Sequence, residues 1–109
     1  MLKTLKLLII DDDVEFTELL SLIMLRKGYK VTVAHSGEDG LEIMKRGTFD
    51  AVLTDMRMAG MSGIDVIKAI KSLDLPENMA PECIMITGYG SIDNAVEAVR
   101  HGAFSYFIK

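Results

Sequence analysis

Short apolar runs alternate with helical patterns along this chain, and that alternation limits the folds it can adopt more than any other feature. The apolar runs predict β-strands at residues 5–10, 30–35, 51–55, 83–87 and 104–109. Between these runs, apolar side chains recur at the spacing of one helix face. Strands that alternate with helices in this way form a parallel sheet covered on both faces. The sequence therefore predicts a doubly wound α/β fold.

The expected helices carry recognisable start and stop signals. Acidic or hydroxyl side chains stand where an N-cap is needed, and glycine is a frequent stop. Helices are expected between these pairs of residues: Asp13 and Gly28, Ser36 and Gly47, Ser62 and Leu73, and Ser91 and Gly102. The second and third helices begin with capping-box patterns, and Asp13 is the best-placed cap of the first. The apolar stripe of the first helix comprises Phe16, Leu19, Leu20, Ile23 and Met24.

The composition describes one soluble domain that spans residues 1–109. A net charge of −4 argues against the broad basic face that nucleic-acid binding requires. The longest apolar stretches have the length of strands, so neither a membrane span nor a signal peptide is expected. Cys83 stands alone, which excludes an internal disulfide and fits the reducing cytoplasm. We therefore expect a cytoplasmic protein that binds neither nucleic acid nor membranes directly.

Carboxylates follow two of the expected strands. Asp11, Asp12 and Asp13 come directly after the first strand, and Asp55 closes the third. If these strands are neighbours, the acids converge at the carboxyl edge of the sheet, where open α/β sheets bind their ligands. Two carboxylates about 4 Å apart repel by roughly 4 kcal/mol at an effective dielectric constant of 20, so such a cluster needs a cation or a proton. The sequence thus suggests a metal site.

Each of these acids also has an ordinary structural alternative. Asp13 is expected to cap the first helix and to take little part in chemistry. Asp11 and Asp12 could be turn or cap residues, because acids after buried strands often cap helices. Their coincidence with Asp55 favours a site instead.

Two further strands end in groups with defined phosphate or metal chemistry. Thr87 ends the fourth apolar run, and Lys109 ends the fifth. Taken alone, Thr87 is an ordinary β-branched strand residue and Lys109 an exposed terminus. The acidic cluster is what makes a functional interpretation preferable for both.

With these residues in this order, the chain resembles the receiver domain of two-component response regulators, most closely the receivers of enhancer-binding transcriptional activators. The resemblance covers residues 5 to 109 and implies a flavodoxin-like fold. Its parallel sheet would have five strands in the order 2-1-3-4-5, which makes the first and third strands neighbours. The residues that carry the resemblance are Asp11-Asp12, Asp55, the loop Gly60-Met61-Ser62-Gly63, Thr87-Gly88, and Tyr106 with Lys109.

The resemblance implies a chemical role for the acidic cluster. Asp55 would be the phosphoacceptor, a carboxylate nucleophile that attacks a phosphohistidine on a sensor histidine kinase or phosphotransfer protein. Mg²⁺ would be the cofactor, bound directly by Asp12 and Asp55, through water by Asp11, and by the backbone carbonyl of Arg57. The chain would then be a phosphoacceptor signalling domain in transcription regulation and not an enzyme with a separate substrate.

The resemblance also implies a switch. Lys109 and the Thr87 hydroxyl would each hold one phosphoryl oxygen. On phosphorylation, Thr87 would move toward the phosphoryl group and Tyr106 would turn inward. This change would reshape the face of the fourth helix and fifth strand, where an output domain or downstream partner would bind. The ordinary alternative for Tyr106 is packing on a half-buried strand.

Other positions bear on the kinetics and on the partner. In this family the residues two beyond the acceptor and two beyond the threonine tune hydrolysis of the acyl phosphate, and here they are Arg57 and Tyr89. Two bulky side chains predict a phosphoryl lifetime of minutes or longer. The cognate kinase is expected to dock near the first helix, at Val14, Glu15 and Glu18.

The chain departs from the family pattern in two places. Ala59 stands where such receivers usually have proline, which predicts a somewhat looser loop. The chain also ends at Lys109, where the family continues through a fifth helix, so we expect a fold that lacks the last helix. Apolar surface beside the first helix would then be open. Either the chain is a piece of a longer protein, or a neighbouring chain in a homodimer covers this surface.

Two other function classes remain as alternatives. Asp11-Asp12-Asp13-Val14 matches the Asp-x-Asp-x-Val start of haloacid dehalogenase-like phosphatases, in which Asp11 would be the nucleophile and Asp13 the general acid. Thr87 could match their second motif. That family needs a further acidic pair after its lysine, however, and the sequence given ends at Lys109. An inert or flavin-binding α/β module is the third possibility, and it lacks a glycine-rich or hydroxyl-rich phosphate loop after the first strand.

Overall fold

The computed structural model describes the chain except for residues 1–3, 77–78, 89–98, 104 and 109. At Thr87, Tyr106 and Ile108 it describes the backbone only. Strands and helices alternate along most of the described sequence, as the hydrophobic pattern predicted. In chain order the elements are β1 (Lys6–Ile10), α1 (Val14–Arg26), β2 (Lys30–Ala34), α2 (Gly37–Arg46), β3 (Ala51–Thr54), α3 (Gly63–Ser72), β4 (Glu82–Thr87) and β5 (Ser105–Ile108).

The strands form one parallel sheet in the order β2-β1-β3-β4-β5. This order makes β1 and β3 neighbours, which was the condition for bringing the acids together. In the β1–β3 register, Ile10 lies opposite Thr54. Both strands therefore end at the same level, and the residues that follow them emerge side by side.

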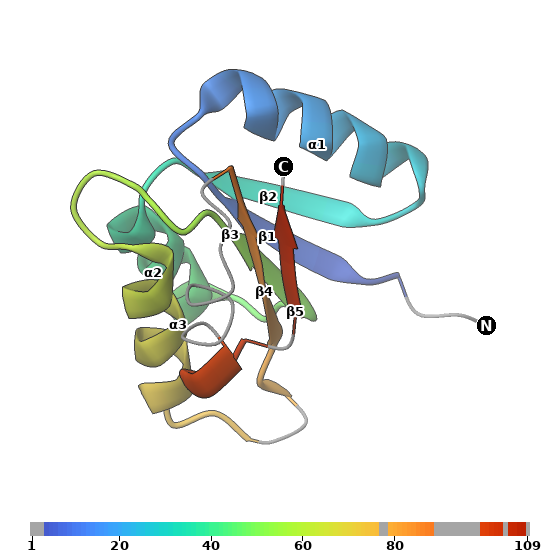
Figure 1. Ribbon diagram of the computed structural model, residues 1–109. Helices are drawn as coiled ribbons and strands as arrows, with labels where there is room; N and C mark the ends of the chain where they lie inside the picture. Colours follow the sequence, from blue (N-terminus) through green and yellow to red (C-terminus); the bar gives the residue numbers. More distant parts are fainter. Residues whose placement is uncertain (1–3, 77–78, 89–98, 104, 109) are drawn as a thin grey trace.

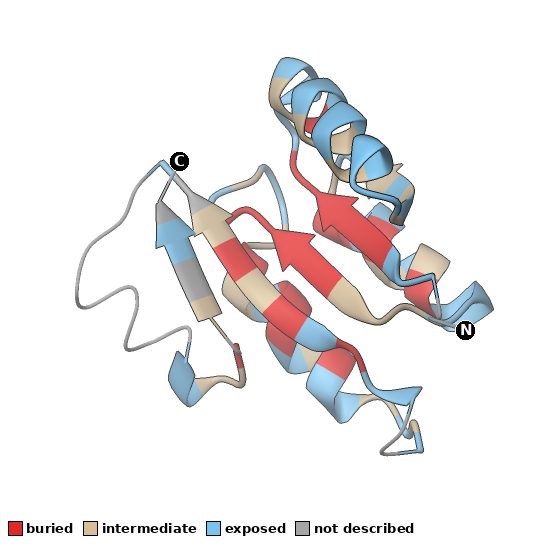
Figure 2. Ribbon diagram, turned by 90° about the vertical axis from the view of Figure 1, so that its right-hand side faces the viewer, coloured by how far each residue is buried: buried red, intermediate tan, exposed pale blue. Residues whose placement is uncertain are grey.

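Helices lie on both faces of the sheet (Figure 1): α1 on one face, and α2 and α3 together on the other. The main core lies between the sheet and the α2–α3 pair, and Figure 2 shows that the buried residues concentrate in the inner strands. Fully burying one such aliphatic side chain stabilises the fold by about 1.5–3 kcal/mol. Cys83 belongs to this core, and burial raises the pKa of its thiol, so it acts as a small hydrophobic residue.

The N-caps predicted for the first three helices are present in the structure. The backbone N–H of Phe16 donates to Asp13 Oδ1 at 3.1 Å, so Asp13 caps α1. Ser36 caps α2 in the same way, and at the start of α3 Ser62 and Asp65 form both bonds of a capping box. The first helix ends before Gly28, whose φ of +94° only glycine adopts readily.

The expected fourth helix falls largely on residues 89–98, outside the described parts of the chain. Its described end is helical at residues 99–100. There the N–H of Gly102 donates to the carbonyl of Val99 at 3.0 Å, and Gly102 has a φ of +109°. This geometry agrees with the predicted stop at Gly102.

The predicted apolar stripe of α1 was partly wrong. Leu19 and Ile23 are 59% and 41% exposed, whereas Thr17 is buried against the sheet. A single helix lying on a sheet buries only the side that faces the sheet, and both of its flanks stay open. Hydrophobic periodicity identified the apolar side chains of α1, but it could not tell which of them the sheet would cover. In the described part of the chain, no helix is long and apolar enough to cross a membrane.

Candidate metal centre

Three carboxylates meet at the carboxyl edge of the sheet. Asp11 and Asp12 follow β1 and Asp55 follows β3, and one oxygen of each lies within 4.8 Å of the others. The backbone N–H of Asp55 donates to the carbonyl of Ile10 at 2.9 Å, which extends the β1–β3 pairing up to the cluster. Asp11 and Asp55 are buried, at 2% and 6% exposure, whereas Asp12 is exposed. The predicted convergence of these acids is therefore present.

A backbone N–H donates to one oxygen of each carboxylate. Hydrogen bonds to an ionised acceptor are shorter and stronger than neutral ones, and they orient the group that accepts them. The longest of the three joins the two loops that carry the cluster. The donor–acceptor pairs are Asp13 to Asp11 at 2.9 Å, Met56 to Asp55 at 2.9 Å, and Ala59 to Asp12 at 3.4 Å.

The side chain of Asp13 lies at the start of α1, apart from the carboxylates of Asp11 and Asp12. Its side chain caps α1 through Phe16, and it is not part of the carboxylate group found among the described residues. The predicted division of labour in the Asp11-Asp12-Asp13 run therefore agrees with the geometry. A carboxylate that is committed to a cap is poorly placed to act as a general acid, which counts against the phosphatase interpretation.

The start of α3 packs directly against the backbone of Asp55. The N–H of Gly63 donates to the carbonyl of Met56 at 2.9 Å. A Cβ atom at Gly63 would overlap the carbonyl oxygen of Asp55. The third helix thus supports the peptide that carries the central acid, and only glycine fits at the point of contact.

The remaining predicted site residues are placed only in part. Thr87 is the last residue of β4, and the register of β4 with its neighbours brings it to the same edge of the sheet as Asp55. Tyr106 lies in β5, opposite Met85. The side chains of both, and all of Lys109, lie outside the described residues, as does Tyr89. Their roles remain predictions.

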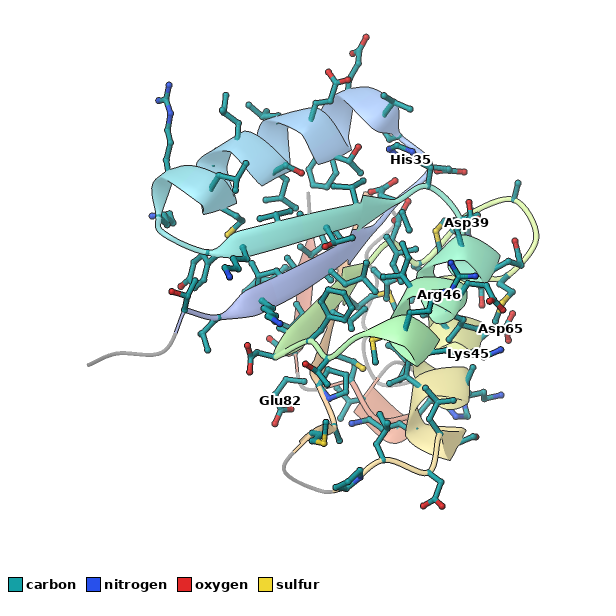
Figure 3. All side chains as sticks on the ribbon, turned by 180° about the vertical axis from the view of Figure 1, so that it is seen from behind. His35, Asp39, Lys45, Arg46, Asp65 and Glu82 are labelled. Atoms are coloured by element: carbon teal, nitrogen blue, oxygen red, sulfur yellow. The ribbon has the colours of Figure 1, made fainter. Side chains whose placement is uncertain are left out.

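Two contacts near the cluster were not predicted from the sequence. Thr17 Oγ1 lies 3.2 Å from His35 Nε2, where β2 ends beside the start of α1 (Figure 3). Glu38, in the first turn of α2, accepts a hydrogen bond from the N–H of Met61 at 3.0 Å. An acid in a first helical turn already has an ordinary explanation in the helix dipole. No sequence signal therefore pointed to the second contact, which joins residues far apart in the chain.

Comparison with known proteins identifies the family. Residues 7–109 match the family model described as response regulator receiver domain. The chain belongs to this family. It is a phosphoacceptor signalling domain of the two-component type, and its curated relatives include transcriptional regulators.

Among these relatives, the receiver is 41% identical over 103 residues to the transcriptional regulatory protein ZraR of Escherichia coli (strain K12). It is 36% identical over 104 residues to the response regulator protein PilR of Pseudomonas aeruginosa. These alignments cover 94% and 95% of the chain but only 22% of each relative. The chain thus spans about a fifth of the length of the curated relatives it matches.

Solved structures agree with this assignment. A putative response regulator from Chloroflexus aurantiacus J-10-fl is 31% identical, with a TM-score of 0.89, and the match covers 98% of this receiver and 86% of that chain. A response regulator protein from Burkholderia pseudomallei is also 31% identical, with a TM-score of 0.86, over 95% of this receiver and 59% of that chain. The Burkholderia structure contains a phosphorylated aspartic acid and a calcium ion.

Proposed function

We propose that this receiver is a phosphorylation-dependent switch in which Asp55 accepts a phosphoryl group from a sensor histidine kinase or a phosphotransfer protein. The observation that carries this proposal is the position of Asp55, buried at the carboxyl edge with its carboxylate beside those of Asp11 and Asp12. The phosphorylated aspartic acid and calcium ion of the Burkholderia relative support it.

The chemistry follows from a carboxylate held next to a cation site. An oxygen of Asp55 attacks the phosphorus of the phosphohistidine, and a P–O bond forms as the P–N bond breaks. The leaving imidazole keeps the electron pair of that bond and takes up a proton. The product is an acyl phosphate on Asp55, whose added charge of about −1.5 to −2 is the signal.

The residues present fit a magnesium site. They offer hard carboxylate oxygens close together on a partly exposed edge, and magnesium prefers such ligands together with several waters. We assign direct ligation to Asp12 and Asp55, a water-mediated contact to Asp11, and a further contact to the backbone carbonyl of Arg57. When bound, Mg²⁺ would neutralise the cluster and the phosphoryl oxygens.

The proposed switch uses residues at the ends of β4 and β5. Lys109 and the Thr87 hydroxyl would each hold a phosphoryl oxygen, and Tyr106 would change its orientation in response. The register of β4 and β5 supports this proposal, because it brings Thr87 and the end of β5 to the carboxyl edge. An output domain or downstream partner would bind the face of the fourth helix and β5. Phosphorylation would change this binding and so alter transcription.

We assign the kinase contact to α1. A hollow of about 320 Å³ runs between this helix and β2, and its lining includes Val14, Glu18 and Leu22. Val14 and Leu22 are 49% and 51% exposed, so this side of α1 offers apolar contact area next to the acidic cluster. Of the residues expected to contact the kinase, Val14 and Glu18 line this hollow, and Glu15 lies on the same exposed helical turn.

The test is incubation with acetyl phosphate and Mg²⁺, followed by mapping of the modified residue by mass spectrometry. We expect the label on Asp55, no label in Asp55→Asn, and normal labelling in Asp74→Asn, an exposed acid at the opposite edge of the sheet. Steady turnover with label on Asp11 would instead support the phosphatase alternative. A parent protein that takes no label would overturn the proposal.

A further inference from the structure

The loop between β3 and α3 is fastened to the start of α2. Glu38 Oε1 accepts a hydrogen bond from the N–H of Met61 at 3.0 Å. The same carboxylate lies against Gly60, where an added Cβ would come within 3.0 Å of Oε1. Gly37 packs so closely against Met61 that a Cβ added at Gly37 would lie 2.8 Å from the Cβ of Met61. The first turn of α2 therefore holds this loop in place through a charge-assisted hydrogen bond and through close packing.

The other side of the same loop reaches the acidic cluster. The N–H of Ala59 donates to Asp12 Oδ2 at 3.4 Å. This bond depends on the residue type, because a proline at position 59 would have no N–H to donate. Residues 59–61 thus connect Glu38 on α2 with Asp12 after β1, through two hydrogen bonds that lie two residues apart in the loop.

We propose that Glu38 is a positioning residue of the metal centre: it holds residues 59–61 so that the Ala59 N–H stays on Asp12. This inference rests on the proposed function of the cluster. Asp12 is the exposed member of the cluster, and an exposed side chain has the most rotamer freedom to lose when a metal binds it. Groups that hydrogen-bond to a metal ligand commonly set how well that ligand binds the ion.

An ordinary role for Glu38 is to place negative charge at the positive end of the α2 dipole. Asp39 allows the two roles to be separated, because it is also an acid in the first turn of this helix (Figure 3). The backbone N–H of Asp39 donates a hydrogen bond to the hydroxyl of Ser36 at 3.1 Å, and that bond does not depend on the Asp39 side chain. Removing the Asp39 carboxylate therefore changes the same charge in the same turn and leaves the loop contact intact.

The test is a calorimetric Mg²⁺ titration of the parent chain, Glu38→Ala, Glu38→Gln and Asp39→Ala. We expect Glu38→Ala to weaken binding by about three- to tenfold, at or below the usual range for losing a supporting group. Glu38→Gln should stay within about twofold of the parent, because its amide oxygen still accepts from Met61. Asp39→Ala should stay within about twofold as well, because dipole effects of exposed charges are small.

A second readout needs no metal. In the magnesium-free protein, the amide protons of Met61 and Ala59, followed by NMR, should exchange with water faster in Glu38→Ala than in the parent and Glu38→Gln. Equal magnesium affinity of Glu38→Ala and parent would overturn the inference and leave the proposed function intact. An equal loss in Asp39→Ala, or unchanged exchange at Met61, would also overturn it. A parent that binds no Mg²⁺ would instead contradict the proposed function itself.

Discussion

At the scale of single residues, Asp55 is positioned by its backbone as much as by its side chain. The N–H of Asp55 continues the pairing with β1, and the next N–H, that of Met56, donates to the carboxylate of Asp55. Gly63 closes the arrangement from the side of α3, so the peptide after Asp55 has little space in which to shift. Close packing of this kind makes the position of the acid sensitive to a single added methyl group.

Gly63→Ala should therefore be costly. Because the new Cβ would overlap the backbone of Asp55, we expect the free energy of unfolding to fall by about 2 kcal/mol, within the range for overpacking. Gly47→Ala is the matched control, since its Cβ would meet only an ordinary contact with Phe49 at 3.8 Å. Urea unfolding of both variants measures the difference, and equal stability of the two would contradict this account of the contact.

The lifetime of the acyl phosphate is also set by single residues. Arg57 is exposed close to Asp55, and Tyr89 occupies the second position expected to tune hydrolysis. We expect bulky groups there to hinder the attacking water, so the phosphorylated protein should persist for minutes or longer. The decay of labelled protein after removal of the phosphodonor measures this, with Tyr89→Ala expected to decay faster. Loss of the label from the parent within seconds would show that these side chains do not shield the site.

At the scale of the elements, local signals predicted helix ends well and packing directions less well. The caps at Asp13, Ser36 and Ser62 could be predicted because each depends on a residue and a backbone N–H within one turn. The exposure of Leu19 on α1 could not, since periodicity reveals an apolar side chain but not which neighbour covers it. The Glu38 contact was missed for a related reason, because it joins elements that no local pattern connects.

The cap of α1 gives a prediction for that element. Asp13→Ala removes the acceptor of the Phe16 N–H, so we expect the free energy of unfolding to fall by about 1 kcal/mol. Asp13→Asn should lose much less, because asparagine caps helices about as well as aspartate. Thermal or urea unfolding decides between them. If Asn were as damaging as Ala, the charge at the helix start and not the hydrogen bond would be responsible.

At the scale of the whole molecule, the sheet order concentrates like charges at one edge. The order β2-β1-β3 could be anticipated only through the resemblance, and it is what turned two separate acidic strand ends into one cluster. Two carboxylates 4.8 Å apart, the upper limit within this cluster, repel by roughly 3 kcal/mol at an effective dielectric constant of 20. The magnesium-free receiver therefore keeps three acids together at a cost that its core offsets, and a cation should stabilise the fold.

The most direct test of this claim is urea unfolding of the parent and Asp55→Asn, each with and without Mg²⁺. Without Mg²⁺, we expect Asp55→Asn to be more stable than the parent by about 1–3 kcal/mol, because the repulsion from Asp11 and Asp12 is gone while the neutral side chain accepts more weakly from the Met56 N–H. At a hundredfold excess of Mg²⁺ over its dissociation constant, the parent should gain about 2.7 kcal/mol and Asp55→Asn far less. A parent that gains nothing, or a variant that gains equally, would contradict the account.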